Sequence, residues 1–260
     1  MRKEHNVAIV LAAGRGSRMN SPVQKQYLTL GGKPVLYYSL KQFEDFEEIQ
    51  EVILVTGEKE IDYCREKIVD VYGLRKVSQI IAGGKERYHS VYNGLRAARE
   101  CDYVFIHDGA RPFIDGKILS AAMQAVRTYH ACVVGMPVKD TIKIADENRF
   151  AEQTPSRDKL WMVQTPQVFS YSLIKEAYER LFEQKITDIT DDAMVLERMQ
   201  GYPVKLVEGS YQNIKLTTPE DLMIAETFLG VTIHGPSANR PQIIRAAHIC
   251  RVLRRLCLRL

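Results

Sequence analysis

Short apolar runs alternate with longer segments of helical period along the first half of this 260-residue chain. The apolar runs cover residues 7–12, 52–55, 77–82, 103–106 and 132–134. The segments between them are Pro34–Phe46, Ile61–Val71, Ser90–Glu100 and Asp115–Tyr129. An alternation of short strands with helices is typical of a parallel sheet covered on its faces by helices. We therefore expect an α/β fold with a mostly parallel sheet flanked by helices.

This alternation breaks between Met136 and Pro166. The segment Val138–Ile144 alternates with period two, and a polar link separates it from the apolar run Leu160–Val163. The pattern predicts a protruding β-arm at about residues 137–165. Because an exposed hairpin is only marginally stable by itself, such an arm folds over the site or contacts another subunit. An ordinary edge hairpin of the main sheet is the alternative.

The remainder of the chain predicts one domain, residues 1–230, followed by an extension, residues 231–260. The domain is expected to end with helices at Leu173–Gln184 and Asp191–Gln200, a strand at Pro203–Val207 and a helix at Pro219–Leu229. The last helix has Pro and Glu in its first turn, as helix starts often do. With 45% hydrophobic and 26% charged residues, the chain can bury a sizeable core.

The extension carries the net positive charge of the chain. It contains six of the 36 basic residues and no acidic residue, which leaves 30 basic against 32 acidic residues in the domain. A nearly neutral domain gives little support for nucleic-acid binding. Within the extension, Ile243–Leu260 has apolar residues near one helical face, which suits an amphipathic helix at an anionic membrane or a partner. A disordered extension is the alternative that we favour.

Cysteine spacing and the N-terminus indicate the compartment. The five cysteines are far apart and form no CxxC pair, which argues against a disulfide framework and against a zinc site. No signal-peptide pattern precedes the first strand, and no apolar stretch is long enough to span a bilayer. We expect a cytoplasmic protein.

The first apolar run leads directly into a glycine turn that carries arginine. Gly14 and Gly16 allow a tight turn that brings backbone N–H groups close to an anion, while Arg18 and Lys25 add fixed positive charge. This combination indicates a site for a nucleoside triphosphate. The turn lacks the Lys-Ser/Thr ending of a P-loop, and Met19 stands where a dinucleotide-binding fingerprint has its third glycine. A plain β-to-α turn is the alternative.

Other candidate residues follow the predicted strands, where ligands bind in open α/β sheets. The run at 77–82 is followed by Gly83–Arg87 and Ser90, and the run at 103–106 by His107–Pro112. Asp108 is placed to hold a divalent cation such as Mg²⁺, with capping of the next turn as its alternative. We interpret His107 as a structural donor, because a phosphate nucleophile needs no base. Ser90 suits helix capping or a contact with a nucleobase.

Taken together, these segments resemble a known family. The motifs that carry the resemblance are Ala12–Met19, Lys25–Leu28, Gly83-Gly84-x-x-Arg87-x-x-Ser90-Val91, His107–Pro112, Asp140–Lys143, Gln164–Gln167, Thr190–Ala193 and Asn213–Leu222. In this order they are similar to those of the 2-C-methyl-D-erythritol 4-phosphate cytidylyltransferases of the non-mevalonate isoprenoid pathway, over about residues 5–229.

The resemblance implies a fold, a reaction and an assembly. The fold is a Rossmann-like core, with a β-arm that exchanges contacts within a homodimer. The reaction joins CTP to 2-C-methyl-D-erythritol 4-phosphate and releases pyrophosphate, with Mg²⁺ as the cofactor. It proceeds by in-line attack on the α-phosphorus, without a covalent enzyme intermediate.

The resemblance also implies the roles of individual residues. The catalytic residues would be Arg18, Lys25, Arg157 and Lys215. The cytidine would be surrounded by Ala12, Ala13, Gly14, Gly84, Lys85 and Ser90. Asp108 would lie near the Mg²⁺ and the sugar. The methylerythritol phosphate would be held by Thr141 and Arg157 across the dimer and by Arg111, Thr190 and Thr217.

One position departs from the family pattern. Gln24 stands immediately before Lys25, where the family usually has proline. The spacing from Arg18 to Lys25 is retained, so we expect the charges to be kept and the loop to be less stiff.

Two other functions are considered: a ribitol 5-phosphate cytidylyltransferase with a similar loop, and a non-catalytic nucleotide-binding module on the same fold. Asp140–Lys143 and Gly109-Ala110 favour methylerythritol phosphate over ribitol phosphate.

Overall fold

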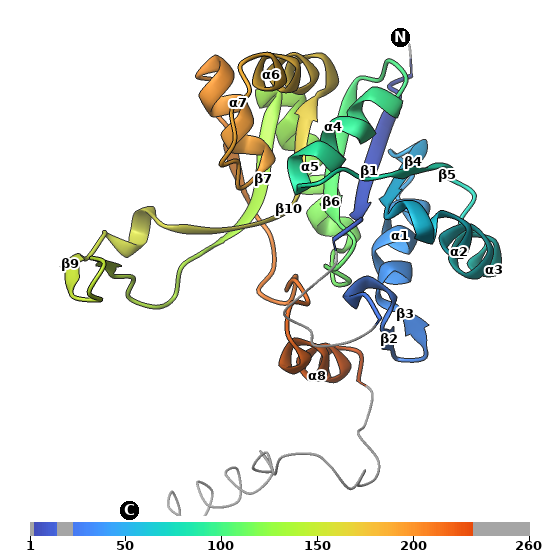
Figure 1. Ribbon diagram of the computed structural model, residues 1–260, viewed down its shortest axis with the longest axis horizontal. Coiled ribbons are helices and arrows are strands. Elements are labelled where there is room, and N and C mark those ends of the chain that lie inside the picture. The colour runs from blue at the N-terminus through green and yellow to red at the C-terminus, as the bar shows by residue number, and fades with distance from the viewer. Residues whose placement is uncertain (1–2, 15–22, 231–260) are drawn as a thin grey trace, which may run out of the picture.

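The computed structural model describes residues 3–14 and 23–230, which form a central sheet between two layers of helices (Figure 1). Within these residues the main sheet has seven strands. In spatial order they are β11 (Lys205–Glu208), β7 (Ala131–Pro137), β10 (Trp161–Ser170), β6 (Tyr103–Asp108), β1 (Asn6–Ala12), β4 (Glu51–Thr56) and β5 (Val77–Ala82). Strand β10 is antiparallel to both of its neighbours, and the other pairs are parallel. The prediction of a mostly parallel sheet is confirmed.

Strand β1 shows why the sheet is covered on both faces. Its side chains alternate between two clusters of buried residues: Ala8 and Val10 belong to one, Val7 and Ile9 to the other. All four are fully buried. Because successive side chains of a strand point to opposite faces, a continuous apolar run requires helices on both sides.

The helices divide between the two clusters accordingly. One face packs against α1 (Val35–Asp45), α5 (Gly116–Tyr129) and the segment formed by α2 (Ile61–Cys64), η4 (Arg65–Val69) and α3 (Asp70–Tyr72). The other face packs against α4 (Arg87–Ala97), α6 (Tyr171–Glu183) and α7 (Asp192–Gln200). Helix α4 begins three residues earlier than the pattern predicts, with Glu86 as its N-cap.

A third, smaller cluster lies beside the ends of the parallel strands. It joins α8 (Pro219–Phe228) to the short strands β2 (Thr29–Leu30) and β3 (Lys33–Pro34) through Leu30, Val35, Leu216 and Ala225. Figure 1 shows α8 beyond the end of the sheet at which β1 finishes. The cluster holds the chain that follows Lys215 against the segment that follows Lys25.

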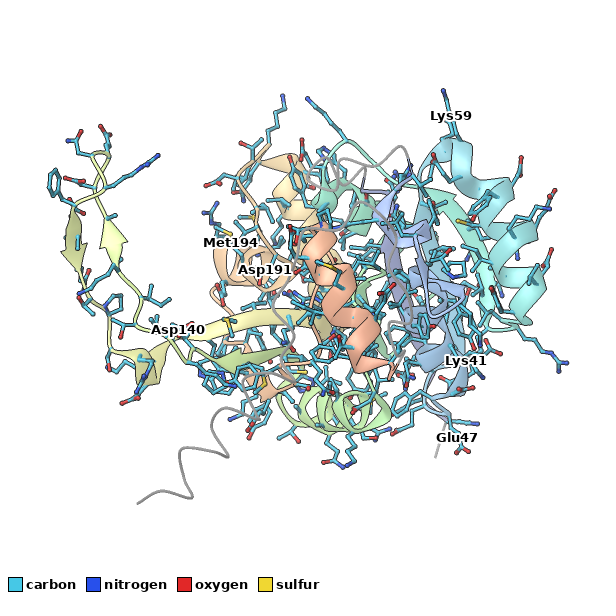
Figure 2. The ribbon with its side chains drawn as sticks, turned by 90° about the horizontal axis from the view of Figure 1, so that it is seen from below. Lys41, Glu47, Lys59, Asp140, Asp191 and Met194 are labelled. Carbon is cyan, nitrogen blue, oxygen red and sulfur yellow. The ribbon has the colours of Figure 1, made fainter. Side chains whose placement is uncertain are left out.

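The arm projects away from the body of the molecule (Figures 1 and 2). It leaves the sheet where β7 ends and returns as β10 begins, with Trp161 paired to Pro137. Its outer part contains β8 (Ile144–Ala145), β9 (Ala151–Gln153) and η5 (Arg157–Lys159). A protruding arm was predicted. The period-two alternation of Val138–Ile144, on which that prediction rests, does not correspond to a continuous strand, because only Ile144 is in one. The side chains of 139–145 are all exposed, so no packed face supports a longer strand.

Two further expectations concern the ends of the chain. The amphipathic or disordered extension, residues 231–260, lies outside the described residues. Among the described residues, no helix combines the length and the apolar character needed to cross a membrane.

Candidate active site

A cavity of about 710 Å³ opens at the C-terminal ends of β1 and β6, beside the loop that joins β5 to α4. Nine of the residues to which the family resemblance assigns a role line it. They are Ala12, Ala13, Gly14, Lys25, Gly84, Lys85, Ser90, Asp108 and Lys215. They come from five separate stretches of sequence, and the carboxyl ends of parallel strands bring them to one edge of the sheet.

The loop between β5 and α4 lies tightly against the end of β1. A Cβ atom at Gly83 would be 2.4 Å from the Cβ of Ala13 and 2.7 Å from Ser90 Oγ, so only glycine permits this approach. The Gly84 N–H donates to Ser90 Oγ (3.0 Å), and the same hydroxyl donates to the Glu86 carbonyl (3.3 Å). The buried Ser90 hydroxyl therefore stabilises the loop between β5 and α4, and Glu86 is the N-cap of α4.

Lys25 lies between anchored neighbours in the short helix η2 (Lys25–Tyr27). The buried Gln26 amide donates to the carbonyls of Ala12 (2.5 Å) and Gly14 (3.2 Å). Tyr27 hydrogen-bonds with Thr56 of β4 (2.5 Å). The backbone that carries Lys25 is therefore joined both to the end of β1 and to β4.

Gln24 adopts a backbone conformation that proline could also adopt, with φ −63° and ψ 141°. Its side chain adds contacts that a proline would lack: Nε2 donates to Glu60 (2.9 Å) and Oε1 accepts from Gln26 (2.6 Å). The expected loss of stiffness at this position is therefore opposed by two side-chain hydrogen bonds.

Asp108, the last residue of β6, is paired with two cations. One carboxylate oxygen accepts from Arg87 Nε at 3.2 Å, and the other lies 2.7 Å from Lys215 Nζ. Burial would raise the pKa of Asp108, but the charges of Arg87 and Lys215 outweigh it and hold that pKa well below its usual value. Asp108 is therefore a permanent carboxylate at the wall of the cavity.

Arg87 is a residue to which sequence analysis assigned no role. Its guanidinium binds the carboxylate of Asp192 through two hydrogen bonds of 2.8 Å while Nε reaches Asp108. Asp192 is fully buried and also accepts from the Tyr178 hydroxyl (2.7 Å). The Arg87 guanidinium thus binds two carboxylates, and through this pairing it holds Asp108 in place. Arg87 and Asp192 both stand in quoted motifs, which is the signal that could have found them.

His107 lies behind Asp108 rather than in the cavity. Its Nε2 donates to the Arg111 carbonyl (3.2 Å), so in the neutral ring Nδ1 is the acceptor. Nδ1 accepts from the Thr165 hydroxyl (3.0 Å), and that hydroxyl oxygen in turn accepts from the Asp108 N–H (3.0 Å). Burial lowers the pKa of His107 to about 4, against smaller opposing effects of Asp108 and of the Arg111 carbonyl. The side chain is neutral and supports the end of β6, as the interpretation of a structural donor expects.

The other candidate residues do not line this cavity. Arg111 donates to the carbonyl of Asn213 (2.7 Å), in the segment between β11 and α8. Thr217 donates to Asp221 (2.8 Å) next to α8, and the exposed Thr190 contacts Met194 of α7. Thr141 and Arg157 are exposed on the arm, where Arg157 donates to the Lys139 carbonyl (3.0 Å). Arg18 lies outside the described residues.

A preformed metal centre is not found in the part of the chain that the structure describes, since no group of three or more His, Cys, Asp or Glu side chains is arranged to hold an ion. Asp108 offers one hard carboxylate at the cavity wall. That donor set suits an ion that takes its other ligands from substrate and water, as Mg²⁺ often does.

Comparisons with known proteins agree with this geometry. The family model described as 2-C-methyl-D-erythritol 4-phosphate cytidylyltransferase matches residues 6–231. Relatives of that name from Lachnospira eligens and Caldanaerobacter subterraneus are 54% and 50% identical, over 86% and 85% of this chain and 99% and 97% of theirs. The crystal structure of a 4-diphosphocytidyl-2C-methyl-D-erythritol synthase from Anaerococcus prevotii superposes with a TM-score of 0.77 at 33% identity, covering 88% of this chain and 97% of that one. The chain therefore belongs to the 2-C-methyl-D-erythritol 4-phosphate cytidylyltransferase family.

Proposed function

We propose that this enzyme joins CTP to 2-C-methyl-D-erythritol 4-phosphate, giving 4-diphosphocytidyl-2-C-methyl-D-erythritol and pyrophosphate. The observation that carries the proposal is the cavity in which Lys25, Lys215 and Asp108 meet the backbone of the Ala12–Gly14 turn. A strand end with glycine, two lysines and an ionised carboxylate suits a nucleotide triphosphate and its counter-ion. Family membership supplies the identity of the two substrates.

In the proposed reaction an oxygen of the methylerythritol phosphate attacks the α-phosphorus of CTP in line. The new P–O bond forms as the bond to the β-phosphate oxygen breaks, and the electron pair leaves with pyrophosphate. The attacking oxygen is already anionic, so no general base is needed. The main task of the protein is to bring two polyanions together and to offset the charge that accumulates between them.

We assign that task to the cations of the cavity. Lys25 contacts the triphosphate and stabilises the charge that develops on the α-phosphate, together with Arg18. Lys215, oriented by Asp108, lies between the two phosphate groups. Gly84, Lys85 and Ser90 surround the cytidine with Ala12, Ala13 and Gly14, and the rigid backbone of these two loops recognises the base.

Mg²⁺ is the proposed cofactor, with Asp108 as its protein ligand. When bound, the ion would neutralise phosphate charge and orient the triphosphate. Asp108 is ionised at all working pH values, which is what a cation ligand requires. Arg87 holds one of its oxygens, so binding of the ion would shift the contact of the other oxygen with Lys215.

The methylerythritol phosphate site is proposed to include residues of a second subunit. Thr141 and Arg157 are exposed and do not line the cavity of their own chain. The arm that carries them projects away from the body of the molecule (Figures 1 and 2). Isolated arms of this kind gain stability by packing on a partner. We propose a homodimer in which Thr141 and Arg157 of one subunit complete the site formed by Arg111, Thr190 and Thr217 of the other.

Pyrophosphate release tests the proposed reaction. The purified protein is incubated with CTP, Mg²⁺ and either methylerythritol phosphate or ribitol 5-phosphate. Release with methylerythritol phosphate alone supports the proposal. Release only with ribitol phosphate would assign the alternative substrate, and no release with either would indicate a non-catalytic nucleotide-binding module.

Lys25→Ala tests the catalytic role of the first lysine. We expect turnover at saturating substrates to fall by at least ~10²-fold, as loss of a transition-state charge partner typically causes. Lys41→Ala is the matched control, because Lys41 is an exposed lysine of α1 paired only with Asp45 among the described contacts. Turnover of Lys25→Ala close to that of the control would remove Lys25 from this role.

The cytoplasmic location and the division into residues 1–230 and 231–260 remain predictions. The extension lies beyond nearly all of the family match, which ends at residue 231. Co-sedimentation with anionic liposomes, with and without residues 231–260, tests a membrane contact of the extension. Equal partitioning would refute it.

A further inference from the structure

The residue before Lys25 is connected to a turn on another part of the sheet. Gln24 donates from Nε2 to Glu60 Oε1 at 2.9 Å. Glu60 ends the short helix η3 (Glu58–Glu60), which follows β4. This turn lies at the edge of the molecule, where the neighbouring Lys59 projects outward (Figure 2). The half-buried Glu60 carboxylate thus reaches back to the segment that carries a proposed catalytic lysine.

Space for this contact depends on Gly57. A Cβ atom at Gly57 would lie 1.9 Å from Glu60 Oε2 and 3.1 Å from its Cδ. The backbone angles of Gly57, φ −64° and ψ 149°, are open to any residue. The backbone conformation therefore does not require glycine here, but a Cβ atom at this position would displace the Glu60 carboxylate from the place that it occupies.

The contact completes a set of anchors around Lys25. After Lys25, Gln26 is bound to the end of β1 and Tyr27 to Thr56 of β4. Before Lys25, the Gln24 amide joins Gln26 on one side and Glu60 on the other. With Gln24 and Glu60 in place, Lys25 is held from both directions along the chain.

We propose that Glu60, acting through Gln24, is a positioning residue for Lys25. Its carboxylate holds the Gln24 side chain, and this restrains the backbone of η2 so that the Lys25 ammonium stays at the triphosphate. Gly57 is part of the device because it leaves room for the carboxylate. The kinetic consequence rests on the proposed role of Lys25, whereas the restraint of η2 does not depend on it.

Steady-state kinetics with four variants test the consequence for CTP. Glu60→Ala removes the acceptor, Gly57→Ala displaces it, Glu60→Gln retains an acceptor oxygen, and Glu58→Ala is the control in the same helix. Loss of one hydrogen bond of this kind corresponds to about a fivefold effect. We expect kcat/KM for CTP to fall about fivefold in Glu60→Ala and Gly57→Ala, because Lys25 is proposed to act both on the bound triphosphate and in the transition state, with the KM for methylerythritol phosphate unchanged. Glu60→Gln and Glu58→Ala are expected to match the wild type.

Hydrogen exchange tests the restraint without substrate. The amides of Tyr27 and Leu28 donate to the Gln24 and Lys25 carbonyls (2.9 and 3.3 Å), so they report on the opening of η2. We expect their protection to fall about fivefold in Glu60→Ala and Gly57→Ala and to be unchanged in Glu58→Ala.

The outcomes separate this inference from the proposed function. Unchanged protection of these amides in Glu60→Ala overturns the restraint, whatever the activity. Unchanged kcat and unchanged KM for CTP in Glu60→Ala, or equal changes in Glu58→Ala, overturn the positioning of Lys25. A wild-type protein that releases no pyrophosphate would refute the proposed reaction, and the exchange data would still decide on the restraint.

Discussion

Replacing Asp192 by asparagine removes the charge that anchors Arg87. In the structure Arg87 binds both carboxylate oxygens of Asp192 at 2.8 Å and reaches Asp108 through Nε. Asp192 has no exposed surface, so water cannot replace the lost charge on its side. The variant leaves a partly buried arginine facing an amide, with Asp108 as its remaining carboxylate partner among the described contacts.

The magnitude follows from this geometry. Breaking a buried pair by removing one partner costs about 3–5 kcal/mol. About a quarter of the Arg87 side chain remains exposed to the cavity (26%), and asparagine keeps one acceptor oxygen, so the lower end applies. We expect a loss of about 3 kcal/mol in the free energy of unfolding, which lowers Tm by roughly 6–12 °C in a domain of this size. Turnover should also fall, because Asp108 loses its fixed partner.

Thermal and urea unfolding measure the loss, with Asp191→Asn as the matched control. Asp191 is the N-cap of the same helix and accepts from the Met194 N–H (3.0 Å) and from Gln167 (3.0 Å), and no contact with Arg87 is described for it. Asparagine caps helices as well as aspartate does, so the control should lose about 1 kcal/mol or less. Equal destabilisation by the two variants would refute the argument that the Arg87 pair, rather than the helix start, carries the energy.

Two further predictions concern stability. His107 has a pKa of about 4 in the folded protein, below the value of about 6.5 expected when unfolded, so the unfolded state takes up the proton first. The contribution of neutral His107 to the free energy of unfolding is fully present above pH 6.5. It is lost as the pH falls toward 4, by about 3 kcal/mol. Urea unfolding in metal-free buffer across this pH range should therefore show a smaller decline of the free energy of unfolding in His107→Gln than in the wild type. Gly94→Ala should cost about 1–3 kcal/mol, because the new Cβ would lie 2.6 Å from Ile9 Cγ2, whereas Gly116→Ala, with nothing within 4 Å, should not destabilise the protein. Equal unfolding midpoints for the two alanine variants would contradict the packing argument.

Local patterns were sufficient to predict the layers of the fold and the edge that carries the site. The run that became β1 is apolar at every position, and only a strand buried on both faces accommodates such a run between turn signals. Gly14 and Lys25 followed from the same logic, since their chemistry suits an anion and their place after a strand puts them at the ligand-binding edge. These inferences use neighbours within a few residues of one another.

The arm shows where local pattern fails. Residues Val138–Ile144 alternate as a strand would, yet only Ile144 is in one, because the side chains from residue 139 onward are exposed and bury no apolar face. Alternation predicts a strand only where one face can be buried, and that condition is tertiary.

The contacts that orient the site were decided by tertiary structure alone. Arg87 and Asp192 are 105 residues apart, and Gln24 and Glu60 are 36 apart. The sequence by itself determined which residues could carry charge and where strands end. Which charge meets which partner depends on how helices and loops pack around the sheet, because a hydrogen bond or ion pair needs atoms within about 3 Å and no short-range pattern specifies that distance.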